Sequence, residues 1–504
     1  MAEQAKQTTP AIVATDKKVA KTKATMDVGE TAQLSGEDLA AKLVGEKPPE
    51  VVKSVVTVAK PAAVRNVAAS RIAAVNKTSV VSGKVETPQV VRIKKGVVSR
   101  PTGVVSRPTY RRSTTTYRTP VAPVVRRPLM TRPICGMLDT FRENMPVLRE
   151  SYTESENDAF VAVGMVRKYK LQPGDVICGE AREPKDNDRF WTLVNIKTVN
   201  GVPLDEFVTQ TRVKFHQLTP VYPDEQIKLE TGADPLSTRI IDLIAPIGKG
   251  QRSLIVSPPK AGKTSLLKEV STGVAANYPD IHLMAVLIGE RPEEVTDMRR
   301  HIEKITKGKG EVAASNFDET ADTQCRVAEL ALERAKRLVE EGRDVVILLD
   351  SITRLARAYN LSIPTSGRTL SGGFDPAALF PPKKFFGAAR NFEVAGSLTI
   401  VGTALVDTGS RMDDLVYEEF KGTGNQELHL DRRLAERRIY PAIEIQKSGT
   451  RRDDLLIDPI TYQAVLTLQR MLDTLDKDER TVTLMDSMKK TKSNKEFLQS
   501  LRSA

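Results

Sequence analysis

Residues 253–270 read SLIVSPPKAGKTSLLKEV, and this stretch decides the fold that we expect for the chain. The apolar run at 254–256 predicts a strand, and the spacing of apolar residues after Lys263 predicts a helix. A loop between a strand and a helix N-terminus can surround phosphate oxygens with backbone N–H groups. Lys263 would then reach the β- and γ-phosphates, and the Thr264 hydroxyl would bind Mg²⁺. Such loops normally open with glycine, whereas this chain has Ser257, so an ordinary turn with a surface lysine remains the alternative.

From about residue 223 onward, short unbroken apolar runs alternate with helical patterns. Runs of this kind are typical of strands that are covered on both faces of a sheet. A helical stripe follows and ends at Gly342, a residue suited to a helix C-terminus. The alternation predicts a mostly parallel, doubly wound sheet with ligands at the carboxyl ends of its strands. The predicted strands are 254–256, 283–288, 345–349 and 398–406.

Two carboxylates stand at the ends of predicted strands. Asp350 follows four apolar residues, where the Mg²⁺ of a nucleotide needs a ligand, although it could instead cap the next helix. Glu290 and Arg291 follow another strand, and Glu290 could polarise an attacking water. An acidic surface turn with Glu293 and Glu294 is the alternative there.

Phosphoryl transfer also needs positive charge at the transferred group. An arginine supplied by a neighbouring subunit contributes about 10³ to 10⁵ in rate, and arginines are frequent between 432 and 452. Two glycine-rich segments, 365–373 and 407–415, carry Arg368 and Arg411. Their flexibility and polarity suit contact with a phosphate backbone, although plain connections would look the same.

The charge of the chain is unevenly distributed. The 504 residues carry a net charge of +12, and residues 51–132 hold 17 basic side chains against one acidic side chain. The repeat GVVSRPTGVVSRPT at 96–109 and frequent prolines exclude a continuous helix or a central strand. We therefore predict that residues 1–132 form a disordered, basic extension. It would either contact nucleic acid without sequence preference or serve only as a spacer.

Residues 133–222 have a different pattern of short apolar runs separated by turn signals, including NDAFVAVGMV at 157–166. Four or five strands in this length predict a small barrel, for which the oligonucleotide-binding (OB) fold is one candidate. Aromatic residues lie beside basic ones, an arrangement that suits stacking of single-stranded bases, although the aromatics could equally be core. The interleaved residues are Phe160, Tyr169, Phe190 and Trp191 with Arg149, Arg167, Lys168 and Arg189. Residues 223–504 would form the α/β domain.

The remaining totals exclude several classes of protein. Cys135, Cys178 and Cys325 are far apart in sequence, so we expect neither a disulfide framework nor a zinc site, and we expect reduced, buried thiols. No apolar run reaches the roughly 18 residues of a membrane span. These features favour a cytoplasmic protein with no membrane contact.

Taken together, several long stretches resemble the bacterial transcription termination factor Rho family. The family implies an α/β RecA-like P-loop ATPase domain and an OB or cold-shock-like RNA-binding barrel. It also implies ATP and Mg²⁺ as cofactors, a homohexameric ring, 5′-to-3′ movement along RNA and release of transcripts from RNA polymerase. The proline-containing phosphate loop without the first glycine is itself a family trait. The stretches are 244–264, 289–298, 345–360, 385–391, 404–430 and 448–456.

The resemblance implies roles for individual residues, carried over by position. Glu290 would activate water, Lys263 would hold phosphate, and Arg451 would act on the neighbouring subunit as a finger. The nucleotide would contact Lys260, Ala261, Gly262, Lys263, Thr264, Ser265, Arg291, Arg438 and Tyr440. Thr264 and Asp350 would hold the metal. RNA would contact Phe160, Arg189 and Phe190 in the barrel and Arg368, Arg411 and Lys421 in the central channel.

The chain departs from the family pattern in the barrel. Members usually carry an aromatic, glycine-containing run ahead of Leu-Arg, whereas this chain reads NMPVLR at 144–149. Losing those faces removes on the order of 1–3 kcal/mol of stacking per base, so we expect an altered RNA preference. Expected partners are single-stranded RNA, the RNA polymerase elongation complex and a Nus-type elongation factor. Two alternatives stay open, a rotary-ATPase-type subunit and a nucleotide-gated RNA-binding protein that does not translocate.

Overall fold

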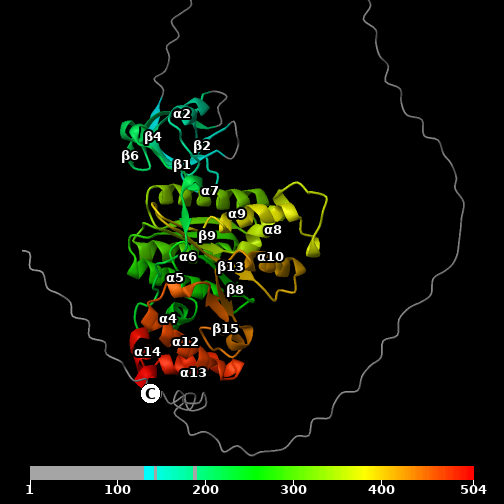
Figure 1. Cartoon of the computed structure of the whole chain (residues 1–504). Helices are drawn as coiled ribbons and strands as arrows, with labels where there is room; N and C mark the ends of the chain where they lie inside the picture. The colour runs from blue at the N-terminus through cyan, green and yellow to red at the C-terminus, as the bar shows by residue number, and fades with distance from the viewer. Residues whose placement is uncertain (1–129, 141–144, 186–189, 504) are drawn as a thin grey trace, which may run out of the picture. The chain divides into compact units, whose positions relative to one another are not determined.

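The computed structural model describes residues 130–140, 145–185 and 190–503. The extension predicted over 1–132 lies outside these ranges except for its last three residues, so that prediction is not tested. The described residues form a small barrel and, further along the chain, a larger α/β sheet with helices on both faces (Figure 1).

The barrel is closed by five strands. β1 pairs with β2 and β4, β2 pairs with β3, and β4 pairs with β5; the parallel contact of β3 with β5 completes the circle. Its interior holds alternate residues of the strands, among them Ile134, Leu138 and Leu193. The predicted small barrel is therefore confirmed. The elements are β1 (Thr131–Asp139), β2 (Val147–Arg149), β3 (Ala159–Phe160), α2 (Val163–Lys168), β4 (Val176–Arg182), β5 (Trp191–Val199), β6 (Val202–Pro203) and α3 (Leu204–Thr209).

One segment of the barrel differs from the expected strand. The run 157–166 forms only the short β3 before the chain turns into α2. Met165, Val166 and Tyr169 pack against the barrel core, and their spacing is that of one helical face. Apolar periodicity over so few residues fits both a strand and a helix, which explains the error.

The expectation of three reduced cysteines was wrong for two of them. Cys135 and Cys178 are joined by a disulfide, with their Cα atoms 4.1 Å apart. Their separation of 43 residues hides the fact that β1 and β4 are antiparallel neighbours in which these two residues face each other. Cys325 is unpaired and buried, as expected.

The α/β domain is built on a seven-stranded sheet in the order β10-β9-β11-β13-β8-β14-β15. Neighbouring strands are parallel except β14 and β15, which are antiparallel, so the mostly parallel sheet is confirmed. The four predicted strands correspond to β8, β9, β11 and β13. The bounds are β8 (Arg252–Ser257), β9 (His282–Glu290), β10 (Glu311–Asn316), β11 (Val345–Asp350), β13 (Leu398–Leu405), β14 (Gln426–Leu430) and β15 (Ile443–Thr450).

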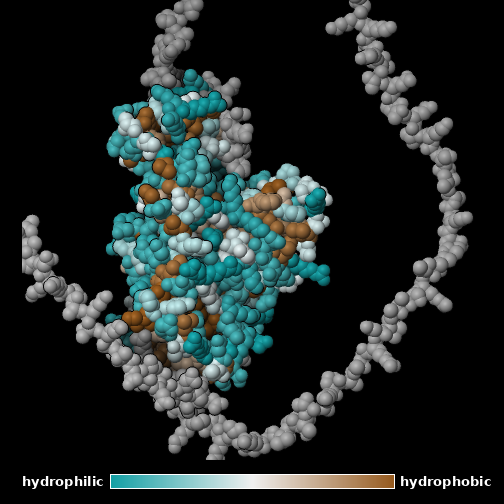
Figure 2. Space-filling model, in the orientation of Figure 1, coloured by the Kyte–Doolittle hydropathy of each residue, from teal (hydrophilic) through white to brown (hydrophobic). Residues whose placement is uncertain are grey.

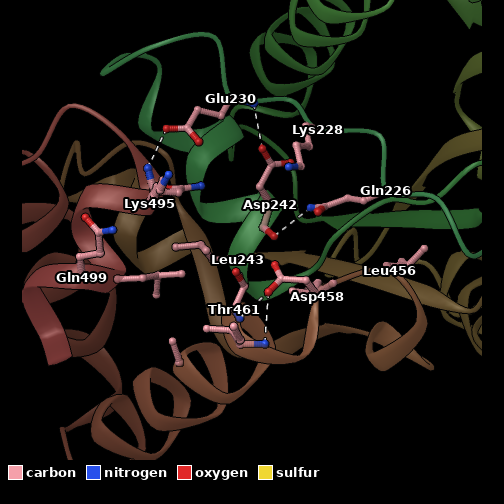
Figure 3. A pocket seen from close by; sticks show the side chains of 15 residues that line it. Gln226, Lys228, Glu230, Asp242, Leu243, Leu456, Asp458, Thr461, Lys495 and Gln499 are labelled. Atoms are coloured by element: carbon pink, nitrogen blue, oxygen red, sulfur yellow. Dashed lines mark hydrogen bonds between the residues drawn. The ribbon is translucent and has the colours of Figure 1, made fainter. Parts of the chain in front are cut away.

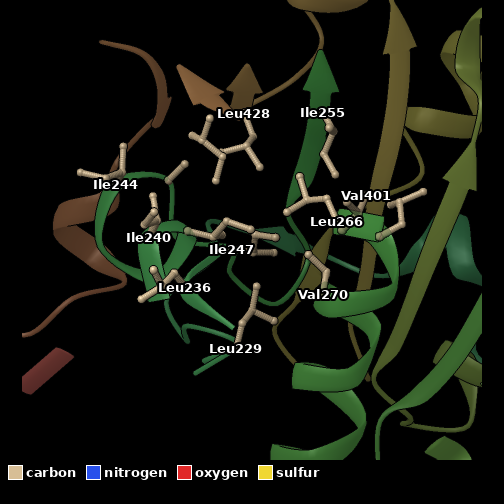
Figure 4. Close-up of a cluster of buried hydrophobic side chains, with 14 of the residues drawn as sticks. Leu229, Leu236, Ile240, Ile244, Ile247, Ile255, Leu266, Val270, Val401 and Leu428 are labelled. Carbon is tan, nitrogen blue, oxygen red and sulfur yellow. The ribbon is translucent and has the colours of Figure 1, made fainter. Parts of the chain in front are cut away.

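Helices cover both faces of this sheet, which is why its central strands are apolar throughout. Ile255 of β8 faces one core together with α4 and α5, as Figure 4 shows, whereas Leu254 and Val256 face the other core with α7 and α8. The helices of the first core are α4 (Leu236–Ile244), α5 (Lys263–Asn277), α6 (Pro292–Thr306), α12 (Pro459–Asp473), α13 (Lys477–Met488) and α14 (Asn494–Ser503). Those of the second are α7 (Ala321–Glu340), α8 (Ile352–Ser362), α9 (Phe380–Phe386) and α10 (Arg411–Lys421).

Smaller elements complete the described chain. β7 (Pro220–Val221) pairs with β12 (Asn391–Phe392), and α11 (Arg432–Glu436) follows β14. Figure 2 shows a mostly hydrophilic surface in which apolar side chains form separate patches. Among the helices of the described ranges, none has both the length and the apolar character needed to span a bilayer.

Candidate functional site

The phosphate loop leads from the carboxyl end of β8 into α5. β8 ends at Ser257 and α5 begins at Lys263, as the sequence predicts. Gly262 precedes the helix with φ at 94°, a left-handed conformation that glycine adopts without strain. A Cβ atom on Gly262 would be in ordinary contact with the ring of Tyr440, at 3.5 Å, so the backbone conformation is what favours glycine here. The helix N-terminus opens to a cavity of about 1020 Å³.

Lys263 holds together the two carboxylates that the sequence predicts at strand ends. Its Nζ lies 3.3 Å from Oε1 of Glu290 and is hydrogen-bonded to Oδ1 of Asp350. Both carboxylates are buried, each with 2% of its surface exposed. Because the carboxyl ends of parallel strands meet at one edge, β8, β9 and β11 bring these three side chains together.

Burial and mutual charge set the protonation of this cluster. Burial raises the pKa of Glu290, and the nearby Asp350 raises it further. Burial alone would lower the pKa of Lys263, but Asp350 and Glu290 outweigh it and the pKa is raised. Lys263 therefore stays a cation, whereas Glu290 is a stronger base than an ordinary glutamate.

Two further side chains hold the carboxylates, and sequence reasoning missed both. Nη2 of Arg354, in the first turn of α8, lies 3.3 Å from Oε2 of Glu290, and its Nη1 donates to the Gly289 carbonyl. The Thr403 hydroxyl donates to Oδ1 of Asp350 at 2.8 Å. Both follow from the fold, since β13 is the neighbour of β11 in the sheet and α8 packs against β9 and β13. A sequence signal was available for Arg354, because it lies four residues after Asp350, at the start of a helix.

Most residues predicted to bind nucleotide line the same cavity. Asp350 is not a lining residue, but it is hydrogen-bonded to Lys263, which lines the cavity. Arg438 is not among the lining residues; it is exposed, two residues before Tyr440, with φ at 61°. The lining residues that the sequence predicts are Lys260, Ala261, Gly262, Lys263, Thr264, Ser265, Glu290, Arg291 and Tyr440.

Arg451 lies away from this cavity. It is exposed and directly follows β15, where Thr450 pairs with Gln426 and Gln426 pairs with Ser253 at the start of β8. The loop begins at the other end of β8, roughly 13 Å further along the strand at 3.3 Å per residue. Within one chain, Arg451 therefore lies beside the amino end of β8, whereas Lys263 lies beyond its carboxyl end.

The two glycine-rich segments lie against each other, and both Arg368 and Arg411 are exposed. Gly372 has φ at 75°, and a Cβ atom there would lie 2.7 Å from the backbone nitrogen of Met412. Only a residue without a side chain allows this approach. Lys421 is exposed at the opposite end of α10, roughly 15 Å from Arg411 along the helix axis.

Helix α8 connects these segments with the cluster of Lys263, Glu290 and Asp350. It starts directly after Asp350 and Ser351 at the end of β11. Further along it, Nε and Nη2 of Arg357 donate to the buried carboxylate of Asp413 at 2.8 and 2.6 Å. Nδ2 of Asn360 donates to the Gly373 carbonyl at 3.4 Å. One rigid element therefore contacts both glycine-rich segments and the carboxylate site.

In the barrel, Phe160 and Phe190 are half-buried, so part of each remains accessible for stacking, whereas Arg189 lies outside the described residues. Arg149 does not have the role that its aromatic neighbours suggested. Its guanidinium is buried and bonded to Asp139 at 2.6 Å and to Asp158 at 2.8 Å, so its charge is compensated inside the barrel.

Comparisons with known proteins agree with both halves of the molecule. Residues 134–205 match the family described as Rho termination factor, RNA-binding domain, and residues 237–450 match the ATP synthase alpha/beta family, nucleotide-binding domain. Transcription termination factor Rho of Aquifex aeolicus is 50% identical over 369 residues, which are 73% of this chain and 84% of that protein. The chain belongs to the transcription termination factor Rho family. The Rho protein of Bacillus subtilis is 55% identical over 348 residues, 69% of this chain and 79% of that protein.

Other Rho proteins are longer. That of Streptomyces lividans is 53% identical over 370 residues, which are 73% of this chain, and the alignment spans 51% of that protein, about half its length.

A second cavity, of about 580 Å³, lies among α4, α12 and α14 (Figure 3). Its wall includes Asp242, whose carboxylate accepts hydrogen bonds from the backbone N–H groups of Leu229 at 3.0 Å and Glu230 at 2.8 Å. Burial raises the pKa of Asp242 to about 7. This carboxylate fixes a loop to α4, and no residue predicted to bind nucleotide lines the cavity.

Proposed function

We propose that this protein is an RNA-dependent ATPase that moves 5′-to-3′ along single-stranded RNA and releases transcripts from RNA polymerase. The observation that carries the proposal is the continuous link from the Lys263 cluster through α8 to the segments of Arg368 and Arg411. A phosphate site and a candidate polyanion site that one helix links suit an enzyme whose hydrolysis depends on RNA. The relatives' name supports termination as the process served.

In the proposed reaction, the N–H groups of the loop and Lys263 hold the β- and γ-phosphates of ATP. Thr264 and Asp350 would hold Mg²⁺, since hydroxyl and carboxylate oxygens are the donors that this ion prefers alongside phosphate and water. The bound ion supplies positive charge against the phosphate oxygens. Ala261, Gly262 and the remaining lining residues shape the loop around the nucleotide.

Glu290 orients and deprotonates the attacking water in this proposal. Its raised pKa strengthens it as a base, and the contact with Arg354 restrains its carboxylate. Tyr440, which is half-exposed at the cavity wall, would pack on adenine. Arg438 would sense the phosphates from the rim.

Arg451 completes the site from a neighbouring subunit. Arg451 lies at the opposite end of β8 from Lys263 of the same chain, which supports action between chains. A ring would bring this side of one subunit against the phosphate loop of the next. A homohexamer would repeat this seam. We propose that RNA in the central channel, held by Arg368, Arg411 and Lys421, shifts α8 and thereby the carboxylates.

The barrel would bind RNA first, through Phe160, Arg189 and Phe190, ahead of the channel. We propose the division into a basic extension (1–132), an RNA-binding domain (133–222) and an ATPase domain (223–504). Partners would be the RNA polymerase elongation complex and a Nus-type elongation factor. Since nascent transcripts are the substrate, the cytoplasm would be the place of action.

A single assay tests the proposal, namely ATP hydrolysis by the full chain with and without homopolymeric RNA. We expect hydrolysis to be slow alone and strongly stimulated by RNA, with strand displacement that requires hydrolysable ATP. Full turnover without RNA would instead favour a rotary-ATPase-type subunit. RNA binding that responds to nucleotide without displacement would favour a non-translocating RNA-binding protein.

A further inference from the structure

Arg132, the second residue of β1, has no carboxylate partner in the part of the chain that the structure describes. Its Nη2 donates to the carbonyl of Asn157 at 2.9 Å and its Nη1 to the amide oxygen of the same residue at 3.3 Å. Both acceptors are neutral, and no carboxylate within the described ranges pairs with Arg132. Arg149 of the same barrel is, by contrast, bonded to two carboxylates. Arg132 therefore keeps its full charge for an anionic partner.

The guanidinium of Arg132 is also fixed in orientation. Its Cζ lies 4.1 Å from the centroid of the Trp191 ring, so the plane rests on an aromatic face while its edge bonds to Asn157. Its Nε is buried without a hydrogen-bond partner. Both residues are half-buried, so part of each remains accessible to solvent. A planar fork that is already immobilised loses less conformational freedom when it binds a phosphate or a flat base.

Through Asn157 and Trp191, Arg132 contacts the two segments to which we assign RNA binding. Asn157 lies three residues before Phe160, and Trp191 directly follows Phe190. β3 and β5 are neighbours in which Ala159 pairs with Trp191, so the two segments start side by side. Arg132 is in addition the last of the 17 basic residues in 51–132. A strand bound at Phe160 and Phe190 would meet this cation.

We propose that Arg132, supported by Trp191 and Asn157, binds the phosphate backbone of single-stranded RNA on the barrel. The inference rests on the proposed RNA binding and adds a contact to it. Phosphate contacts position a strand without reading its sequence. Arg132 thereby offsets part of the stacking that the chain lacks in the stretch NMPVLR at 144–149, and it makes binding to the barrel less dependent on base identity.

The first test is a salt titration of the full chain with a fluorescein-labelled oligouridylate and a matching oligocytidylate. One phosphate contact contributes about 0.7 to the slope of log affinity against log salt, or about fourfold in affinity at 0.15 M salt. We expect Arg132→Gln to show this loss with both RNAs. Arg132→Lys should keep the slope, since it keeps the charge. Lys197→Gln is the control, because Lys197 of β5 pairs with Glu180 at 2.8 Å.

The second test uses Trp191, the single tryptophan of the chain, as a local reporter. We expect either RNA to change its fluorescence over the concentrations at which anisotropy reports binding. This change should be largely lost in Arg132→Gln, whose thermal midpoint should match that of the wild type. Binding to the basic extension alone would leave the fluorescence unchanged.

The outcomes separate the inference from the function on which it rests. Wild-type affinity and slope in Arg132→Gln would overturn the inference alone. So would weaker binding with an unchanged slope, because Arg132 would then only support the barrel. Absence of RNA binding by the wild type would overturn the proposed function and the inference together.

Discussion

The Lys263 cluster and Arg132 of the barrel hold their charges in opposite ways. Glu290 and Asp350 are buried around the half-buried Lys263, and the three charges compensate one another, whereas Arg132 lies half-buried on Trp191 without a carboxylate partner among the described residues. Bond cleavage requires groups fixed in a dry site before the substrate arrives. Binding of a long polyanion requires charge and flat faces that remain accessible. The two regions thus show charged side chains used for two tasks, distinguished by whether a carboxylate compensates the cation.

The largest effect that we expect comes from Arg451, which follows β15 at the end of the strands away from the phosphate loop. Arg451→Ala should lower RNA-stimulated hydrolysis by about 10³ to 10⁵ while ATP binding persists, because only the transferring phosphoryl group needs the finger. The measurement is turnover with saturating RNA, beside nucleotide affinity. Arg452→Ala is the matched control, since the adjacent Arg452 pairs with Asp454 at 2.9 Å. Equal losses in both variants would contradict the assignment.

The buried glutamate comes next. Glu290→Gln should lower hydrolysis by about 10² to 10⁴ with little change in nucleotide affinity, because a general base contributes that much to rate. The exposed Glu293 in the first turn of α6 provides the control variant Glu293→Gln. Near-normal turnover in Glu290→Gln would show that the buried cluster is structural, and the contrast with the barrel would lose its meaning.

A smaller effect is expected in the barrel, where single contacts are accessible and replaceable. Phe160→Leu should weaken RNA binding about 5- to 150-fold, the equivalent of roughly 1–3 kcal/mol for one stacked base. The salt slope should stay unchanged, since no charge is removed. Val194→Ala, on the exposed side of β5, serves as the comparison. An unaffected affinity in Phe160→Leu would place the bases elsewhere.

The pH dependence is the mildest test of the buried cluster. Since burial and Asp350 raise the pKa of Glu290, its ionised form is lost as the pH falls through that raised pKa, at a higher pH than for an ordinary glutamate. Stimulated hydrolysis should therefore decline about tenfold per pH unit on the acid side. The residual rate of Glu290→Gln should lack this decline. A wild-type rate that stays constant into the range of an ordinary glutamate would contradict the role as base.

The sequence predicts the parts of the fold that carry a strong pattern. β8, β9, β11 and β13 are continuous apolar runs because both of their faces are covered. β10, β14 and β15 were missed since they mix charged and small residues, as in EVAASN at 311–316. Lys263, Glu290 and Asp350 lie together as predicted, because strand ends fix where such residues meet, whereas their roles stay predictions.

The remaining features depend on pairing that no local pattern carries. The partners of Arg149 and Arg132 come from segments whose register only the closed barrel sets. The same holds for Cys135 and Cys178, which face each other across β1 and β4. Residues of one type can thus be a compensated core charge or an open ligand contact, and only the fold distinguishes them.

Mixing two inactive variants tests the central claim most directly. The Lys263→Ala variant lacks the side chain that holds the phosphates, and the Arg451→Ala variant lacks the arginine that acts on the neighbouring subunit. Each variant alone should therefore be inactive with RNA. A mixed ring contains subunit interfaces in which an intact Lys263 meets an intact Arg451 of the next subunit. We predict that single-turnover, RNA-dependent hydrolysis reappears on mixing. A mixture no more active than its two components would contradict a reaction shared between neighbouring chains.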